Sequence, residues 1–192
     1  MREQAHHYAP EVETFVREQH RRRSQRRSGS AGFSPLAALA IAGGVVAVSA
    51  LVGRRYSPQR SHPKIARWYH DLEKPGMTPP DPVFGAVWPV LELFLATGGY
   101  RLMRAPRSPE RDAAIALWLV NVVMIGGWSK IFFGERSLGG GLAGSAAMIG
   151  TGAAFVERAS HVDGVAAATG VPFTAWVAFA TALSEEVWRR NA

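Results

Sequence analysis

The stretch from Trp68 to Trp88 reads WYHDLEKPGMTPPDPVFGAVW, and it stands immediately before a long apolar run. Proline fixes φ and has no backbone N–H to donate, so a segment this rich in proline forms a stiff connector rather than a helix. The prolines are Pro75, Pro79, Pro80 and Pro82. The stretch therefore predicts an ordered loop between two helices, whose tryptophans serve either as interface residues or as part of a binding site.

Apolar segments on both sides of this loop are long enough to cross a bilayer. A helix of about 20 residues spans the roughly 30 Å hydrocarbon layer. Glu92 and Lys130 are the charged residues that interrupt the central parts of these segments. The predicted spans are residues 34–53, 83–104, 112–133, 137–157 and 164–188. The pattern predicts an all-α fold, an integral membrane bundle of five transmembrane helices with a long structured loop between the first two. It excludes a soluble domain and a β-barrel.

The N-terminal residues 1–32 differ from the rest, because they are polar and rich in arginine in a chain of net charge +7. We expect them to form a disordered tail ahead of a single membrane domain over residues 33–192. Attraction to anionic lipid headgroups is the simplest use of the clustered arginines, and no nucleic acid is expected as a partner. The basic flank predicts a cytoplasmic N-terminus. A signal peptide cleaved after Val48-Ser49-Ala50 is the alternative interpretation of the first span.

Small residues dominate the fourth span. Gly140 and Gly144, like Ala143 and Ala147, are four residues apart and so share a helix face. Such faces let helix backbones approach closely within lipid. The spacing predicts close packing, either inside the bundle or against a second subunit.

Motifs for catalysis or metal binding are missing from the sequence. The chain has no cysteine, which excludes disulfides, thiolate metal sites and cysteine nucleophiles. There is no Ser-His-Asp order, phosphate-binding glycine loop or useful pair of carboxylates. His6 and His7 are adjacent, which is poor spacing for a metal site on a helix. No catalytic residue, metal site or obligatory cofactor is predicted.

Several motifs, in order, resemble the TspO/MBR family, the tryptophan-rich sensory proteins related to the mitochondrial translocator protein. The resemblance begins with the 68–88 stretch and covers roughly residues 34 to 191. It continues through Trp128-Ser129, Phe132-Phe133-Gly134, Val171-Pro172-Phe173, the run from Trp176 to Leu183, Trp188 and Asn191. It implies a five-helix membrane protein, expected in a bacterial cell membrane and as a homodimer, whose long loop covers a ligand cavity. The family ligands are porphyrins, haem-type tetrapyrroles, sterols and synthetic aromatic compounds.

The resemblance also implies a set of candidate ligand-binding residues with flat apolar side chains and few polar groups. They are Trp68, Trp88, Glu92, Asn121, Trp128, Phe173 and Trp176. This chain departs from the family at several of these positions. Phe173 replaces the usual tyrosine, which removes a hydrogen-bond donor from the expected pocket. An apolar aromatic cavity with one acid is what remains.

Two further departures introduce charge, since the family usually has tyrosine at the position of Glu92 and proline at that of Lys130. Ionisable groups within spans are costly and point to function by default. We hypothesise that Glu92 and Lys130 meet inside the bundle, directly or through water. The alternative is that Lys130 extends to the headgroups while Glu92 is protonated or hydrated. In the loop, residues 65–72 are expected to form a short amphipathic helix with Trp68 and Tyr69 toward the membrane.

Three functions are compatible with these observations. The favoured one is a binding protein for an apolar or tetrapyrrole ligand, acting in sensing or transport. The second is light-dependent porphyrin breakdown, linked with the family, in which Trp88 and Trp176 would take part. The third is a structural membrane partner with a degenerate ligand site, favoured by the lost polar residues.

Overall fold

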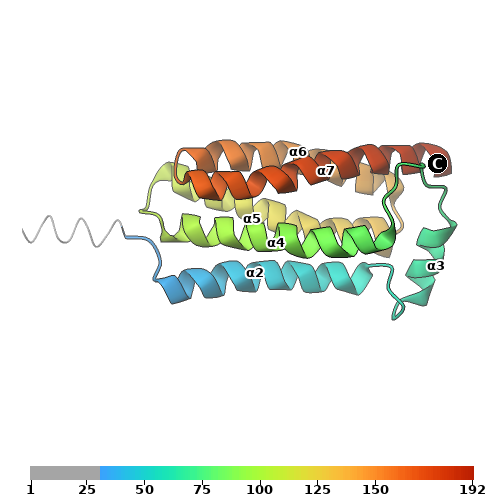
Figure 1. The fold of residues 1–192 in the computed structure, drawn as a ribbon, viewed down its shortest axis with the longest axis horizontal. Helices are drawn as coiled ribbons and strands as arrows, with labels where there is room; N and C mark the ends of the chain where they lie inside the picture. The colour runs from blue at the N-terminus through green and yellow to red at the C-terminus, as the bar shows by residue number, and fades with distance from the viewer. Residues whose placement is uncertain (1–30) are drawn as a thin grey trace, which may run out of the picture.

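The computed structural model describes residues 31–192, in which five long helices run side by side (Figure 1). They are α2 (Pro35–Tyr56), α4 (Asp81–Arg104), α5 (Pro109–Ser129), α6 (Leu138–Ser160) and α7 (Gly164–Asn191). A π-helical turn, η1 (Lys130–Gly134), extends α5, and the short helix α3 (Pro63–Asp71) lies in the loop after α2. Each long helix is apolar and long enough to cross a membrane, and the described residues contain no strand. The predicted all-α fold with five spans is confirmed. Residues 1–30 of the predicted tail lie outside the part of the chain that the structure describes.

Polar side chains begin four of the long helices. In each case an oxygen of the residue before the helix accepts a hydrogen bond from a backbone N–H of the first turn. These capping residues are Ser34, Ser108, Ser137 and Asp163. The caps satisfy first-turn donors that have no partner within the helix.

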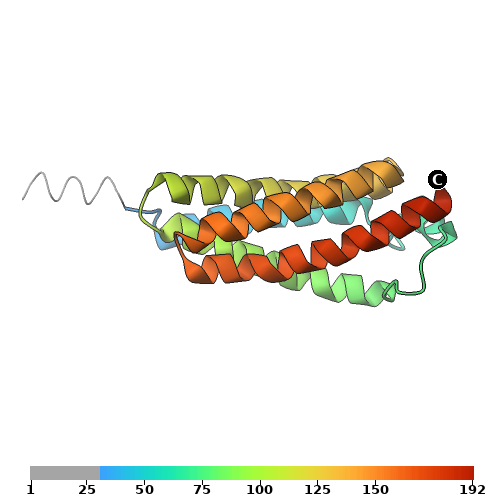
Figure 2. The ribbon, with the colours of Figure 1, turned by 90° about the horizontal axis from the view of Figure 1, so that it is seen from above.

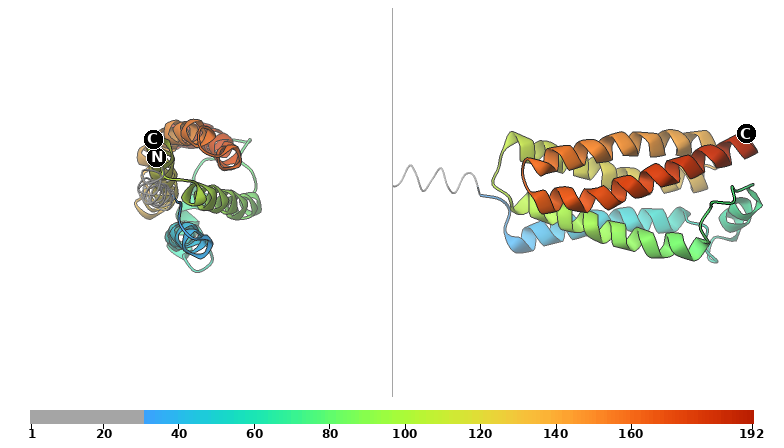
Figure 3. Two further views of the ribbon diagram at one scale, coloured as in Figure 1. Left: turned by 90° about the vertical axis from the view of Figure 1, so that its left-hand side faces the viewer. Right: turned by 45° about the horizontal axis from the view of Figure 1, so that its top comes forward.

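The long helices form a closed ring, seen end-on in the left view of Figure 3. Around the ring the order is α2, α4, α7, α6 and α5, and α5 packs against α2 again. Consecutive helices run antiparallel, as the short connections predict, and α4 also contacts α5 (Figures 1 and 2). The loop containing α3 lies at one end of the ring, beside the C-terminal end of α7 (Figure 1).

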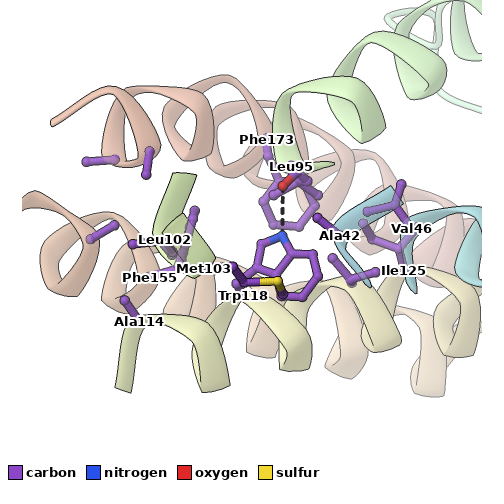
Figure 4. Close-up of a cluster of buried hydrophobic side chains, with 14 of the residues drawn as sticks. Ala42, Val46, Leu95, Leu102, Met103, Ala114, Trp118, Ile125, Phe155 and Phe173 are labelled. Carbon is purple, nitrogen blue, oxygen red and sulfur yellow. Dashed lines mark hydrogen bonds between the residues drawn. The ribbon is translucent and has the colours of Figure 1, made fainter. Parts of the chain in front are cut away.

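The tightly packed core lies in the half of the bundle away from α3. Trp118 is its central residue, 1% exposed, and its indole N–H donates to the Leu95 carbonyl at 2.7 Å (Figure 4). A Cβ added at Gly99 would lie 2.5 Å from the Trp118 ring, so this glycine is required for the close approach of α4 and α5. Phe155 and Phe173 complete the cluster from α6 and α7. The sequence indicated no role for Trp118, whereas the structure buries its side chain at the centre of the hydrophobic core.

The small residues of α6 divide between two faces. A Cβ at Gly144 would lie 3.3 Å from Trp128, so the Gly140–Gly144 face packs inside the bundle. Ala143 and Ala147, by contrast, are exposed on the outer surface. The predicted close packing is therefore intramolecular on one face, while the other faces outward.

Candidate functional site

A cavity of about 580 Å³ occupies the half of the bundle nearest α3. All five long helices, η1 and the loop over the end of the bundle contribute to its lining. Most of its wall area is aromatic or aliphatic, and the aromatic members come from α3, α4, α5, η1 and α7. They are Tyr69, Phe84, Trp88, Trp128, Phe132, Phe133 and Trp176. The proline-rich stretch between α3 and α4 thus borders a cavity with flat apolar walls.

The roof of the cavity is the segment 72–80, which joins α3 to α4. Lys74 and Thr78 of this segment line the cavity. The side-chain amide of Asn191, at the end of α7, holds the roof in place. Its oxygen accepts from the Glu73 N–H at 2.9 Å, and its nitrogen donates to the Glu73 carbonyl at 3.0 Å. The same nitrogen donates to Val187 at 2.8 Å, which fixes the amide on its own helix. The C-terminal turn of α7 therefore clamps the roof through one residue.

An aromatic cluster attaches α3 to the end of α5. Trp68 packs edge-on against Phe132 at 5.8 Å between ring centroids, and Tyr69 packs against Phe133 at 5.4 Å. Trp128 stacks on Phe132 with ring centroids 4.7 Å apart and planes 9° from parallel. The pKa of the Tyr69 hydroxyl is raised to about 12, mainly by burial and to a smaller extent by the nearby negative charge of Asp81. The short helix predicted over residues 65–72 is present as α3 (Pro63–Asp71), and its aromatic side chains turn toward η1 at the end of the third span.

Two buried polar atoms at the cavity have no hydrogen-bond partner among the described residues. They are the indole nitrogen of Trp176 and the hydroxyl oxygen of Thr78. Phe84 and Phe179 pack against the Trp176 ring at 5.8 and 5.5 Å between centroids and hold it in place. Buried donors without partners are rare in folded proteins, because each has lost its hydrogen bonds to water. Both groups line the cavity, so a ligand carrying an acceptor would satisfy them.

Glu92 lines the cavity on α4, one helical turn beyond Trp88. Lys130 begins η1, and its ammonium group lies 3.6 Å from the carboxylate of Glu135, where both side chains are 55% exposed. The two groups form no direct ion pair, so the direct form of the Glu92–Lys130 hypothesis is wrong, whereas pairing through water stays a prediction. Lys130 continues the α-helical register of α5, since its N–H bonds to the Gly126 carbonyl, and its exposed side chain pairs with Glu135 rather than reaching into the bundle.

Four of the predicted site residues line one cavity, and three lie elsewhere. Those brought together are Trp88, Glu92, Trp128 and Trp176. Asn121 is fully buried in α5, where its side-chain oxygen accepts from the Thr151 hydroxyl at 2.9 Å. Phe173 is fully buried in the core cluster. Trp68 supports the cavity from behind through Phe132 and does not line it.

Sequence reasoning did not select several residues that line the cavity. Phe132 and Phe133 belong to the quoted WSKIFFG motif, so their place in the motif was an available signal. Ser145 and Met148 lie on α6 among small residues with no motif of their own. Their position follows from the rotation of α6 against its neighbours, which only the structure reveals.

The chemistry offered by this arrangement is recognition of a flat apolar molecule. The walls supply ring faces, Trp176 and Thr78 supply donors, and Glu92 supplies an acceptor or a charge. Within residues 31–192, no group of three or more histidine, aspartate or glutamate side chains is placed to hold a metal ion.

Comparison with known proteins gives a consistent result. The sequence model of the TspO/MBR family matches residues 37–189, which run through all five long helices and the roof. The human translocator protein is 33% identical over 132 residues, covering 68% of this chain and 78% of the human protein. The protein CrtK of Rhodobacter capsulatus is 30% identical over 125 residues, covering 65% and 78% of the two chains. The tryptophan-rich protein TspO of Chlorobaculum tepidum is 30% identical over 135 residues, covering 67% and 83%.

Proposed function

Because this chain belongs to the TspO/MBR family and is a multi-pass membrane protein, we propose that it binds a flat apolar ligand, such as a porphyrin or a sterol, in the cavity beneath the roof segment. Binding serves sensing or transport of that ligand. The observation that carries the proposal is the aromatic cavity itself. Its volume of about 580 Å³ lies within the range of small-molecule sites, about 300–1,000 Å³.

The walls suit a planar ring system. Trp128 and Phe132 are stacked nearly parallel at the cavity edge, and Trp88 and Trp176 line it from α4 and α7. Aromatic contacts contribute about 0.5–1.5 kcal/mol each beyond the area that they bury. The unpartnered Trp176 N–H supports a ligand with an acceptor near the rings.

Titration of the full chain in lipid nanodiscs with protoporphyrin IX in darkness tests the proposal. We expect saturable binding of the wild type, measured by the shift of the porphyrin absorption band. Trp88→Ala and Trp176→Ala should each bind the porphyrin at least about tenfold more weakly. Trp188→Phe is the matched control, since Trp188 is exposed on α7 and does not line the cavity. Equal binding by the wild type and both cavity variants would contradict the proposal. No saturable binding of a tetrapyrrole or sterol would favour a structural membrane partner.

Light-dependent porphyrin breakdown is the second candidate, because Trp88 and Trp176, the tryptophans that it requires, line the same cavity. The same titration under illumination distinguishes it from binding alone. A new absorbing product that disappears in both tryptophan variants would establish breakdown. An unchanged porphyrin spectrum would leave binding as the function.

For the setting of the protein, we propose a bacterial cell membrane, a cytoplasmic N-terminus and a homodimer. The arginine-rich flank of the first span supports this orientation. The roof and the C-terminus lie at the opposite end of the bundle from the first residues of α2 (Figure 1). With the proposed cytoplasmic N-terminus, the cavity would open on the outer side. Protease protection of tags fused at the two termini tests the orientation, and light scattering tests the dimer.

A further inference from the structure

The charged residues that line the cavity differ in depth. Arg54 lies in the last turn of α2, Lys74 in the roof and Asp81 at the first position of α4, so all three lie at the cavity mouth. Glu92 is eleven residues beyond Asp81 on the same helix, which places it about 16 Å deeper at 1.5 Å per residue. Among the described lining residues, it is the charged group that reaches the cavity floor.

No group of the described chain compensates the Glu92 carboxylate. It has no hydrogen-bond or salt-bridge partner within residues 31–192, and Lys130, the other charged residue in the central spans, pairs with Glu135 instead. The cavity lining also includes Ile125 and Met148, which are apolar, and Ser145 and Ser184, which are polar but uncharged. An acid in such surroundings is costly unless a partner arrives from outside, and intramembrane acids commonly serve as counter-ions to a ligand.

The walls next to Glu92 favour a cation. Trp88 precedes it by one helical turn, so the two side chains lie on the same side of α4. Trp128 and Trp176 line the cavity from α5 and α7. Indole faces attract quaternary and protonated amines, and sites that bind such groups combine aromatic walls with an acid.

We propose that, among flat apolar ligands, this cavity prefers a lipophilic amine, whose cationic nitrogen pairs with Glu92 at the floor while its rings lie against the tryptophans. The inference rests on the proposed function, because it specifies the ligand class for the same cavity. It also sets the orientation of the ligand. A cationic group points inward to Glu92, whereas a carboxylate on a ligand would remain at the mouth near Arg54 and Lys74.

A pair of probes of equal shape tests the role of charge. The cation is (2-naphthylmethyl)trimethylammonium, and the neutral probe is 2-neopentylnaphthalene, in which carbon replaces the nitrogen. Binding of each is measured by equilibrium dialysis against nanodiscs holding the full chain, with empty nanodiscs as the blank. We expect the cation to bind at least about tenfold more tightly than its neutral isostere. Glu92→Gln should remove this preference, because glutamine keeps the size of the side chain and loses its charge.

Asp81→Asn is the matched control, because it removes an acid from the same helix and the same cavity but at the mouth. The cation preference should survive this change. A wild type that binds both probes equally overturns the inference while leaving the proposed function intact, and this comparison requires no variant. A preference that survives Glu92→Gln also overturns it. If neither probe nor protoporphyrin IX binds saturably, the proposed function fails as well.

Discussion

The clamp between Asn191 and Glu73 gives a direct prediction for the stability of the cavity roof. Asn191→Ala removes two hydrogen bonds, of 2.9 and 3.0 Å, that join the end of α7 to the segment 72–80. A typical intramolecular hydrogen bond contributes about 0.5–1.5 kcal/mol net. Both groups are exposed, so the lower part of that range applies and the pair contributes about 1–2 kcal/mol to roof closure. This difference corresponds to an opening equilibrium about 5- to 30-fold more favourable.

Hydrogen exchange with mass spectrometry in nanodiscs measures this opening. Amides of the segment 72–80 should exchange about 5- to 30-fold faster in Asn191→Ala, and the Glu73 N–H should show the largest change, because Asn191 is its acceptor. Asn191→Asp retains this acceptor and loses the donor to the Glu73 carbonyl, so its effect should be smaller. Arg190→Ala is the control, since Arg190 bonds to Glu186 on its own helix.

The result that would refute this reasoning is equal exchange in the wild type and in Asn191→Ala. The roof would then be held by the aromatic contacts of α3 alone. In that case Phe132→Ala, which removes the ring against which Trp68 packs, should accelerate exchange where Asn191→Ala does not.

Two further predictions concern the half of the bundle away from the roof. Gly99→Ala should lower stability by about 1–3 kcal/mol, because its Cβ would lie 2.5 Å from the Trp118 ring, whereas Gly150→Ala, with open space around it, should have little effect. Thermal unfolding in detergent measures both, and equal losses would contradict the packing argument. The second concerns the Asp163 carboxylate, whose pKa is lowered by its hydrogen bond with Arg101. A lowered pKa in the folded state means that stability is present at neutral pH and is lost as the pH falls through that pKa. The unfolding temperature of the wild type should therefore fall on acidification more steeply than that of Asp163→Asn, and parallel profiles would contradict the assignment.

Much of the fold follows from sequence because lipid imposes strict conditions on it. Every backbone group in the hydrocarbon layer needs an internal partner, so long uncharged segments must be helices that span the membrane. The predicted spans and the helices of the structure accordingly begin and end within a few residues of one another. The prolines from Pro75 to Pro80 mark the connector between α3 and α4 for an equally local reason, and Pro82 stands in the first turn of α4, where proline is tolerated.

Rotation of the helices could not be predicted in the same way. In a soluble protein, polar residues mark the outer face of a helix, but in a membrane both the lipid-facing and the core-facing sides are apolar. Phe173 therefore has no signal that separates the core from the cavity, and the structure places it in the core. Trp118 lacks such a signal too, although its indole N–H bonds to α4. Lys130 differs from these two, because the sequence placed it inside a predicted span, whereas in the structure it lies at the end of α5, exposed and paired with Glu135.

The contrast between the two halves of the bundle explains how a ring of helices can be both stable and hollow. In the half away from the roof, Gly99 lets Trp118 approach α4 closely, and the resulting core buries the largest side chains. Toward the roof, the corresponding face of α4 carries Trp88 and Glu92, whose size and charge oppose such an approach. The cavity is then closed from outside, by the roof segment and its clamp at Asn191. Because each half depends on different contacts, substitutions at Gly99 should change global unfolding, whereas those at Asn191 should change opening of the cavity alone.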